Sequence, residues 1–175
     1  LGIELFILPQ AGLGDIYREQ NDNNSAQKMM GNVARFLEQV DIYSLDWNYS
    51  VIVCAQLAKY FFGIGEYQQA FDYYQKSYQG SQNIQLFSHL SSDLMDVQVR
   101  LWIHQGDMDS AQCWVEQTSK GARKNLSLPE QIAKARIRLA LDRPKIALDL
   151  LEEIELQART SKMNGYLIEC LILEA

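Results

Sequence analysis

The apolar residues of the chain recur at helical spacing along most of its length. In the stretch 144–161 they return every three or four positions, which places them on one face of a helix. These residues are Ile146, Ala147, Leu150, Leu151, Ile154 and Ala158. No segment alternates as a strand does, and only three prolines interrupt the chain. The pattern predicts an all-α fold of about nine helices, at about 8–20, 23–43, 46–63, 66–79, 84–105, 107–120, 129–141, 144–161 and 163–175.

One stretch has the pattern of a helical hairpin. An apolar helix ends near Gly65, a Glu-Tyr pair follows, and a second helix begins before Ala70. This pattern resembles the tetratricopeptide repeat (TPR), a hairpin of 34 residues with large, small and aromatic residues at fixed offsets. The matching positions hold Leu57, Ala58, Phe61, Gly65, Tyr67, Ala70 and Tyr74. In such a hairpin the glycine ends the first helix without a β-carbon, and the alanine lets the two helices approach closely.

The same offsets fit around three further alanines, Ala26, Ala111 and Ala147, although the last match has Arg138 where an aromatic is expected. The pattern predicts hairpins at about 8–43, 46–79, 84–120 and 129–161, with the next hairpin starting at 163–175. We expect them to form one TPR-like domain over 1–175, an α-solenoid in which stacked hairpins make a right-handed superhelix. The chain starts without methionine and stops inside an apolar helical pattern, so we expect a fragment of a larger protein.

Composition and charge narrow the class of protein. The 175 residues are 47% hydrophobic and 22% charged, with a net charge of −6, and the cations are not clustered. Nucleic-acid binding needs clustered cations, and a membrane span needs about 18 consecutive apolar residues, so we expect contact with neither. Cys54, Cys113 and Cys170 lie far apart in apolar segments, which predicts buried, reduced thiols in a cytoplasmic protein.

Catalytic chemistry is not indicated. The two histidines, His89 and His104, stand outside any metal-ligand motif, and no phosphate-binding loop is present. Paired carboxylates such as Glu152 and Glu153 are typical of a solvated helix face. We therefore expect no enzyme activity, no cofactor and no metal. The aromatic residues Phe61, Tyr67, Tyr74 and Trp102 are predicted to pack between helices rather than to hold a ligand.

A candidate binding surface lies on the first helix of each hairpin, which lines the concave face of TPR-like superhelices. The position after the small residue of the repeat is predicted to point into this groove, and it holds Asp15, Lys59, Arg100 and Arg136. The predicted ligand-binding residues are Lys59, Phe62, Asp96, Arg100, His104 and Arg136. Cations beside apolar groups suit an anionic or polar ligand or an acidic peptide. A solvated face that carries charge for solubility is the equal alternative.

The second half of the chain carries an ordered set of repeat motifs. They are Gly106-Asp107 followed by Ala111 and Trp114, the helix Ile137–Leu141, the run Ala147–Leu151, and the helix Leu167–Ala175. In this order they resemble the helical-repeat sensor region of MalT-like, ATP-dependent transcriptional activators of the LuxR family. The resemblance covers about residues 45–175 and is strongest after residue 100.

The resemblance implies a signal-sensing and protein-interaction domain of a bacterial transcription regulator. In that family an N-terminal nucleotide-binding oligomerisation module and a C-terminal helix-turn-helix flank the sensor, and the full-length protein would self-associate. It also implies that a small-molecule inducer or a regulatory protein or peptide binds the repeats. The alternative is a stand-alone TPR adaptor or peptide-receptor scaffold, which would share the fold but lack the flanking modules.

Overall fold

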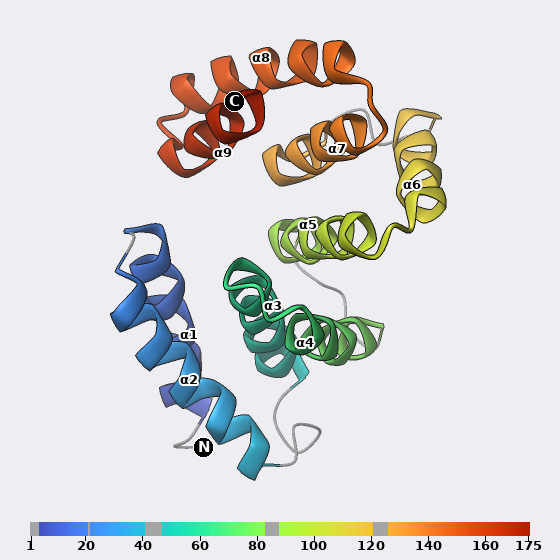
Figure 1. Ribbon diagram of the computed structural model, residues 1–175. Coiled ribbons are helices and arrows are strands. Elements are labelled where there is room, and N and C mark those ends of the chain that lie inside the picture. Colours follow the sequence, from blue (N-terminus) through green and yellow to red (C-terminus); the bar gives the residue numbers. More distant parts are fainter. Residues whose placement is uncertain (1–3, 21, 41–46, 83–87, 121–125) are drawn as a thin grey trace. The chain divides into compact units, whose positions relative to one another are not determined.

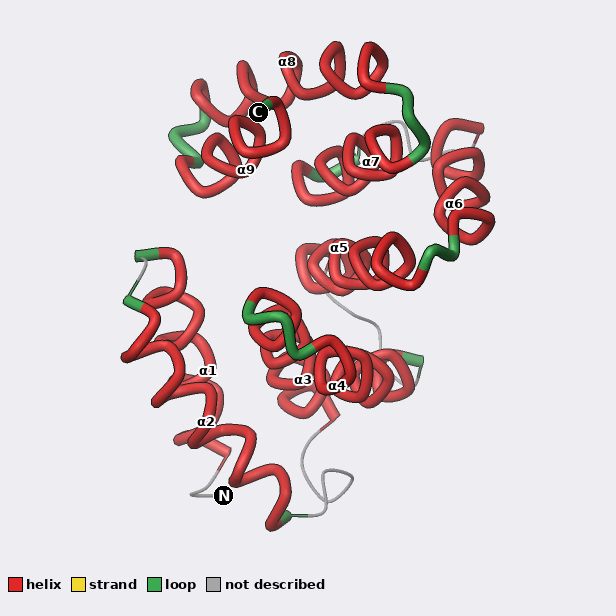
Figure 2. Tube along the Cα trace, viewed as in Figure 1, coloured by secondary structure: helices red, strands yellow, loops and turns green. Residues whose placement is uncertain are grey.

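The computed structural model describes residues 4–20, 22–40, 47–82, 88–120 and 126–175. These residues form nine helices and no strand. Figures 1 and 2 show the order of the helices along the chain. The helices are α1 (Glu4–Glu19), α2 (Asn23–Gln39), α3 (Trp47–Gly63), α4 (Tyr67–Ser81), α5 (Ser88–Gln105), α6 (Met108–Lys120), α7 (Leu128–Ala140), α8 (Pro144–Thr160) and α9 (Asn164–Glu174). The predicted fold class, an all-α, TPR-like solenoid of antiparallel hairpins, is confirmed.

The first helix begins earlier than predicted. It starts at Glu4 rather than near residue 8, so it contains Pro9. A proline inside a helix cannot donate a hydrogen bond, here to the Leu5 carbonyl. Ile7 and Ala11 are nevertheless both buried, so one apolar face continues across the proline and holds the helix together. The predicted residues 41–43 of the second helix, 46 of the third and 84–87 of the fifth lie outside the described part of the chain.

The chain divides into two compact units, residues 1–90 and 91–175. In the first unit α1 packs against α2, α3 packs against α4, and α1 also contacts α3. The small residues of the repeat are at the close contacts, because Ala58 and Ala70 are fully buried and a β-carbon on Gly14 would lie 2.9 Å from Met30 Cγ. The buried Ser77 hydroxyl ties α4 to α3 by donating to the Val51 carbonyl over 2.8 Å.

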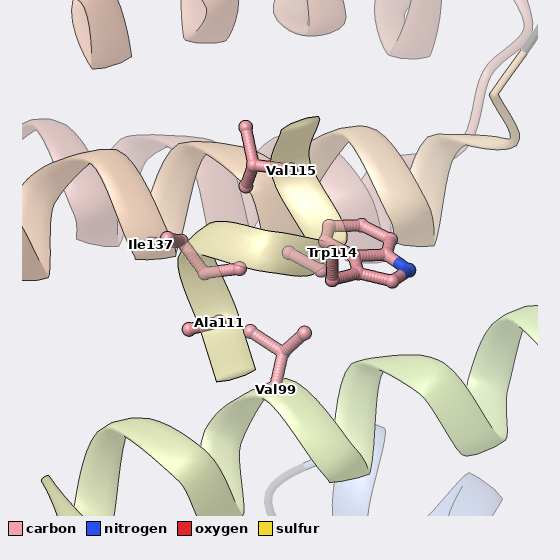
Figure 3. Close-up of a cluster of buried hydrophobic side chains, with 6 residues drawn as sticks. Val99, Ala111, Trp114, Val115 and Ile137 are labelled. Atoms are coloured by element: carbon pink, nitrogen blue, oxygen red, sulfur yellow. The ribbon is translucent and has the colours of Figure 1, made fainter. Parts of the chain in front are cut away.

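The second unit is built around two apolar clusters. The first joins α5, α6 and α7 and consists of Val99, Ala111, Trp114, Val115, Ala133 and Ile137, most of which Figure 3 labels. The second joins α7, α8 and α9 and consists of Leu128, Ile132, Ala135, Leu151, Ile154 and Cys170. Helix α7 contributes to both clusters, so each hairpin buries its apolar residues against the next one.

The turns inside the hairpins share one backbone conformation. Gly65 and Gly106 have φ of +84° and +74°, and the following residue donates its N–H to a carbonyl five positions back: Glu66 to Phe61 and Asp107 to Trp102, each over 2.9 Å. This is the Schellman motif at a helix C-terminus. Its left-handed residue is usually glycine, because a β-carbon in that conformation would crowd the neighbouring backbone. The turn between α7 and α8 has the same ending with Asp142, φ 55°, in the glycine position.

Helix α9 leaves much of its apolar surface uncovered. Only Cys170 is fully buried in this helix, where it joins the second apolar cluster with the partly buried Tyr166 and Leu173. The exposed apolar strip of α9 consists of Ile168, Leu171 and Ile172.

Candidate functional site

Three of the predicted binding residues lie together in the second unit. Asp96 and Arg100 from α5 meet Arg136 from α7 and a fourth residue, Glu169 from α9, and we call these four residues the ion cluster. Arg100 Nε donates to Asp96 Oδ2 over 2.7 Å. Nη2 of Arg100 and Nη2 of Arg136 both donate to the same atom, Glu169 Oε1. The cluster therefore joins three helices through one shared carboxylate oxygen.

The repeat positions the two arginines. Val99 and Ala135, the small residues that precede them, are fully buried in the two apolar clusters. The next residue along each helix is turned by about 100° from its neighbour, so each arginine sits at the edge of the core, partly exposed. Arg100 and Arg136, two residues of the predicted row, reach the same carboxylate.

Glu169 was missed from the sequence. It lies 33 residues after Arg136, close to one repeat length. The row Asp15, Lys59, Arg100, Arg136 does not lead to it, because the residue before Glu169 is Ile168, which is large and exposed rather than small and buried.

The ion cluster contains two guanidiniums and two carboxylates, so its formal charges cancel. Burial alone would raise the pKa of Glu169, but Arg100 and Arg136 outweigh burial and hold that pKa below its usual value. Burial also opposes the charge of Arg100, yet Asp96 and Glu169 raise its pKa above the usual range. For Arg136, burial and then the neighbouring Arg100 lower the pKa. Both guanidiniums remain charged at neutral pH, since arginine loses its proton only far above pH 7.

One side of the ion cluster is incompletely hydrogen-bonded. Asp96 Oδ1 and Arg136 Nε are buried, lack a hydrogen-bond partner, and lie 3.8 Å apart, which is an ion-pair contact but too long for a hydrogen bond. A buried polar group without a hydrogen bond loses its hydration without full compensation. Arg136 is therefore held mainly through Glu169.

The remaining predicted residues lie elsewhere. Lys59 and Phe62 belong to the first unit, where Lys59 Nζ is 3.8 Å from Asp15 Oδ2 and the Phe62 ring packs edge-on against Tyr67, with 5.1 Å between ring centroids. Asp15 also accepts from Arg18 over 2.9 Å. His104 is exposed near the end of α5. The structure thus describes the predicted residues in two groups, one in each unit.

The aromatic predictions hold for three of the four residues. Tyr74 is buried, Phe61 stacks on Tyr73 with 5.4 Å between centroids, and Trp102 packs against the first apolar cluster of the second unit. Tyr67 is 39% exposed, contrary to the expectation of a packed ring. It is the first residue of α4, and its ring packs edge-on against Phe62.

The cysteine prediction is wrong at one position. Cys54 and Cys170 are buried, and burial raises the pKa of their thiols to about 12 and about 11. Cys113 is exposed, because the next two residues of α6, Trp114 and Val115, occupy the apolar cluster and turn Cys113 toward solvent. Its sulfur accepts a 3.2 Å hydrogen bond from Gln117 Nε2.

The described part of the chain was also compared with the requirements of a metal site and of a membrane-spanning helix. No group of three or more histidine, cysteine, aspartate or glutamate side chains in this part of the chain could hold a metal ion. No helix there has both the length and the hydropathy that crossing a membrane requires.

The comparisons with known proteins bear on the whole chain. The family model of the MalT-like TPR region matches residues 3–175. The match therefore extends to the residues before 45, which the sequence resemblance did not cover. Neither a curated protein nor a solved structure matches the chain significantly.

Proposed function

The chain belongs to the family of MalT-like TPR regions, and from that premise we propose that it is the signal-sensing and protein-interaction region of a bacterial transcription regulator. On this proposal an inducer or regulatory partner binds the face formed by the first helices of successive hairpins. The flanking nucleotide-binding and helix-turn-helix modules of such a regulator belong to the same proposal, as does a cytoplasmic location.

The observation that carries the proposal is the meeting of Arg100 and Arg136 at one point from two successive hairpins. A pair of guanidiniums matches the geometry of carboxylate and phosphate groups, and partial burial strengthens each contact because less water screens it. The ligand class that fits is therefore a small molecule with an anionic group, or an acidic peptide. The ligand-binding residues in this unit are Asp96, Arg100 and Arg136, with His104 at the end of the same helix.

Lys59 and Phe62 form a second candidate contact in the first unit. Lys59 is a partly exposed cation, and Phe62 follows it three residues later on the same helix, which suits a ligand that has both anionic and apolar parts. An extended peptide is the natural ligand for such a surface, and this favours the second candidate function, a stand-alone TPR adaptor or peptide-receptor scaffold. The sequence flanking residues 1–175 in the full-length gene product separates the two functions.

The experiment is a thermal-shift screen of sugars, phosphorylated metabolites and acidic peptides. A ligand present at 100 times its dissociation constant adds about 2.7 kcal/mol to the free energy of unfolding, which such a screen detects. We expect the shift caused by a hit to disappear in Arg136→Gln and to weaken in Arg136→Lys, which keeps the charge but loses the planar donor pair.

Arg159→Gln is the matched control, because Arg159 pairs with Glu155 on the exposed face of α8. It should leave the ligand-induced shift unchanged. A hit whose shift survives Arg136→Gln would remove the ion cluster from the proposed site. An Arg159→Gln variant that also lost the shift would show that the effect is one of net charge rather than of a specific site.

A further inference from the structure

The two carboxylates of the ion cluster differ in how firmly they are held. Asp96 lies on the same helix as Arg100, four residues before it, and its side chain is 11% exposed. Glu169 comes from a different helix, α9, and its side chain is 27% exposed, the largest value in the cluster. The carboxylate on the solvent side of the arginine pair is therefore the one that a separate helix supplies.

Helix α9 is weakly anchored by apolar contacts. Within the described residues it buries one residue, Cys170, whereas α7 buries five apolar residues, and the apolar strip of α9 faces solvent. The two bonds from Glu169 to the arginines add to the contact of Cys170 with the second apolar cluster in connecting α9 to α5 and α7. An element with few buried apolar contacts opens at a lower free energy than the core around it.

We propose that Glu169 is an internal anion that an external oxyanion group replaces, and that this exchange loosens α9. The inference rests on the proposed function and adds the state of the site without ligand. When Glu169 turns out to solvent, Arg100, Arg136 and Asp96 keep a net charge of +1, which a carboxylate or phosphate group neutralises. Asp96 stays in place because it pairs with Arg100 on its own helix.

The exchange accounts for how a ligand in this region produces a change of structure. A ligand shifts a conformational equilibrium only if it favours one state over the other. Here the ligand and Glu169 compete for the same guanidinium groups, so ligand binding removes the bonds from Glu169 to α5 and α7 and leaves Cys170 packed in the second apolar cluster. The consequence of binding is an α9 held by fewer contacts.

The test compares wild type with Glu169→Gln and Glu169→Ala, using sodium acetate and sodium phosphate as separate probes and sodium chloride at the same ionic strength as the control. Without its competing charge, the site should bind an anion more tightly. We expect half of the thermal stabilisation at a concentration at least tenfold lower in Glu169→Gln than in wild type. A response to acetate alone identifies a carboxylate site, and a response to phosphate alone identifies a phosphate site.

Two variants guard against a general effect of charge. Glu152→Gln, which removes a carboxylate from an exposed position of α8, should respond as wild type does. Glu169→Gln combined with Arg136→Gln should lose the gain. If Glu169→Ala does not fold, Glu169→Gln alone carries the test, because it keeps the size of the side chain.

The second measurement is amide hydrogen exchange of the wild-type chain. Addition of the effective anion should speed exchange in α9 and leave α7 protected. Equal anion affinity in wild type and Glu169→Gln, or slower exchange in α9, overturns the inference. If a ligand loses its thermal shift in Arg136→Gln and still gives either of these results, the proposed function holds and only the exchange of Glu169 is wrong. Failure of the inference is therefore distinct from failure of the proposed function.

Discussion

At the scale of single residues, Glu169 makes stability depend on pH. Its pKa in the folded chain lies below the value of about 4.3 expected when unfolded, because Arg100 and Arg136 outweigh the effect of burial. The unfolded chain therefore takes up the proton more readily. The stabilisation is fully present above about pH 5 and is lost as pH falls through the folded pKa.

We expect the free energy of unfolding to be steady between pH 7 and about pH 5 and to fall below it. Glu169→Gln should lower the free energy of unfolding by about 1–3 kcal/mol at pH 7, because it leaves two partly buried guanidiniums with one carboxylate. It should also flatten the acid slope. Urea unfolding followed by circular dichroism at a series of pH values measures both effects. An identical acid slope in the variant would contradict the assignment of this titration to Glu169.

Thiol reactivity is a second residue-scale prediction. At pH 8 the exposed Cys113 should react quickly with a disulfide reagent, while Cys54 and Cys170 should react only on unfolding, because both are buried and their pKa values are about 12 and about 11. Thiol titration should give one fast equivalent in the native protein and three in urea. Cys113→Ser should abolish the fast phase; a remaining fast thiol would mean that a buried cysteine is accessible.

At this scale the sequence predicts the direction in which a side chain leaves its helix, but it does not predict which residue that side chain contacts. Helical spacing indicates which way Arg100 points, since the residue before it is buried. It does not indicate which charged residue Arg100 pairs with, because Glu169 is 69 residues away in the sequence and reaches Arg100 only after α7 and α9 have packed. Cys113 shows the same limit, since an apolar neighbourhood in sequence does not mean burial once Trp114 and Val115 have taken the inner face.

At the scale of elements, the turns test the role of glycine. Lys162 ends α8 with φ 56°, the conformation that Gly65 and Gly106 adopt, although a lysine β-carbon is disfavoured there. Lys162→Gly should raise the free energy of unfolding by about 1 kcal/mol. The control is Lys145→Gly in the first turn of α8, where glycine should instead destabilise by a similar amount. Thermal denaturation measures both, and equal signs would contradict the account.

The elements themselves were the most predictable part of the molecule, because each rests on a local pattern. The glycine turns and the small residues at the helix contacts were placed correctly. Pro144 begins α8, and Pro129 lies in the first turn of α7, where Glu130 also accepts hydrogen bonds from the backbone N–H and the hydroxyl of Ser127. The start of α1 is at Glu4 rather than near residue 8, because burial of Ile7 and Ala11, which is a tertiary effect, overrides the preference of proline for a helix start.

At the scale of the whole molecule, the repeat organisation predicts that a substitution in one apolar cluster destabilises mainly the helices around that cluster. Ile137 is fully buried in the first apolar cluster of the second unit, so Ile137→Ala should cost about 2–5 kcal/mol. Each hairpin depends on its neighbours, so hydrogen exchange should rise first in α5 to α8 and least in α1 and α2. Ile146→Ala, at an exposed position of α8, is the control with little effect. A uniform rise along the chain would mean that the molecule unfolds as one cooperative body.

The joining of hairpins into larger bodies was the least predictable level. The chain divides into two compact units, whereas the repeat pattern predicted a single domain over residues 1–175. A hairpin pattern fixes which faces are apolar and so which neighbours pack. It does not fix the angle between successive pairs, which depends on side-chain interdigitation. One continuous domain and a right-handed superhelix therefore stay predictions.

The exposed apolar strip of α9 also governs how the protein behaves in concentrated solution. The strip consists of Ile168, Leu171 and Ile172 and favours association between copies of the chain. The net charge of −6 opposes this association, because like-charged molecules repel one another. Added salt screens that repulsion and leaves the strip unchanged. The second virial coefficient measured by static light scattering should therefore turn negative at high salt, and Ile172→Glu should keep it positive without loss of helix. Storage at low ionic strength is the practical consequence.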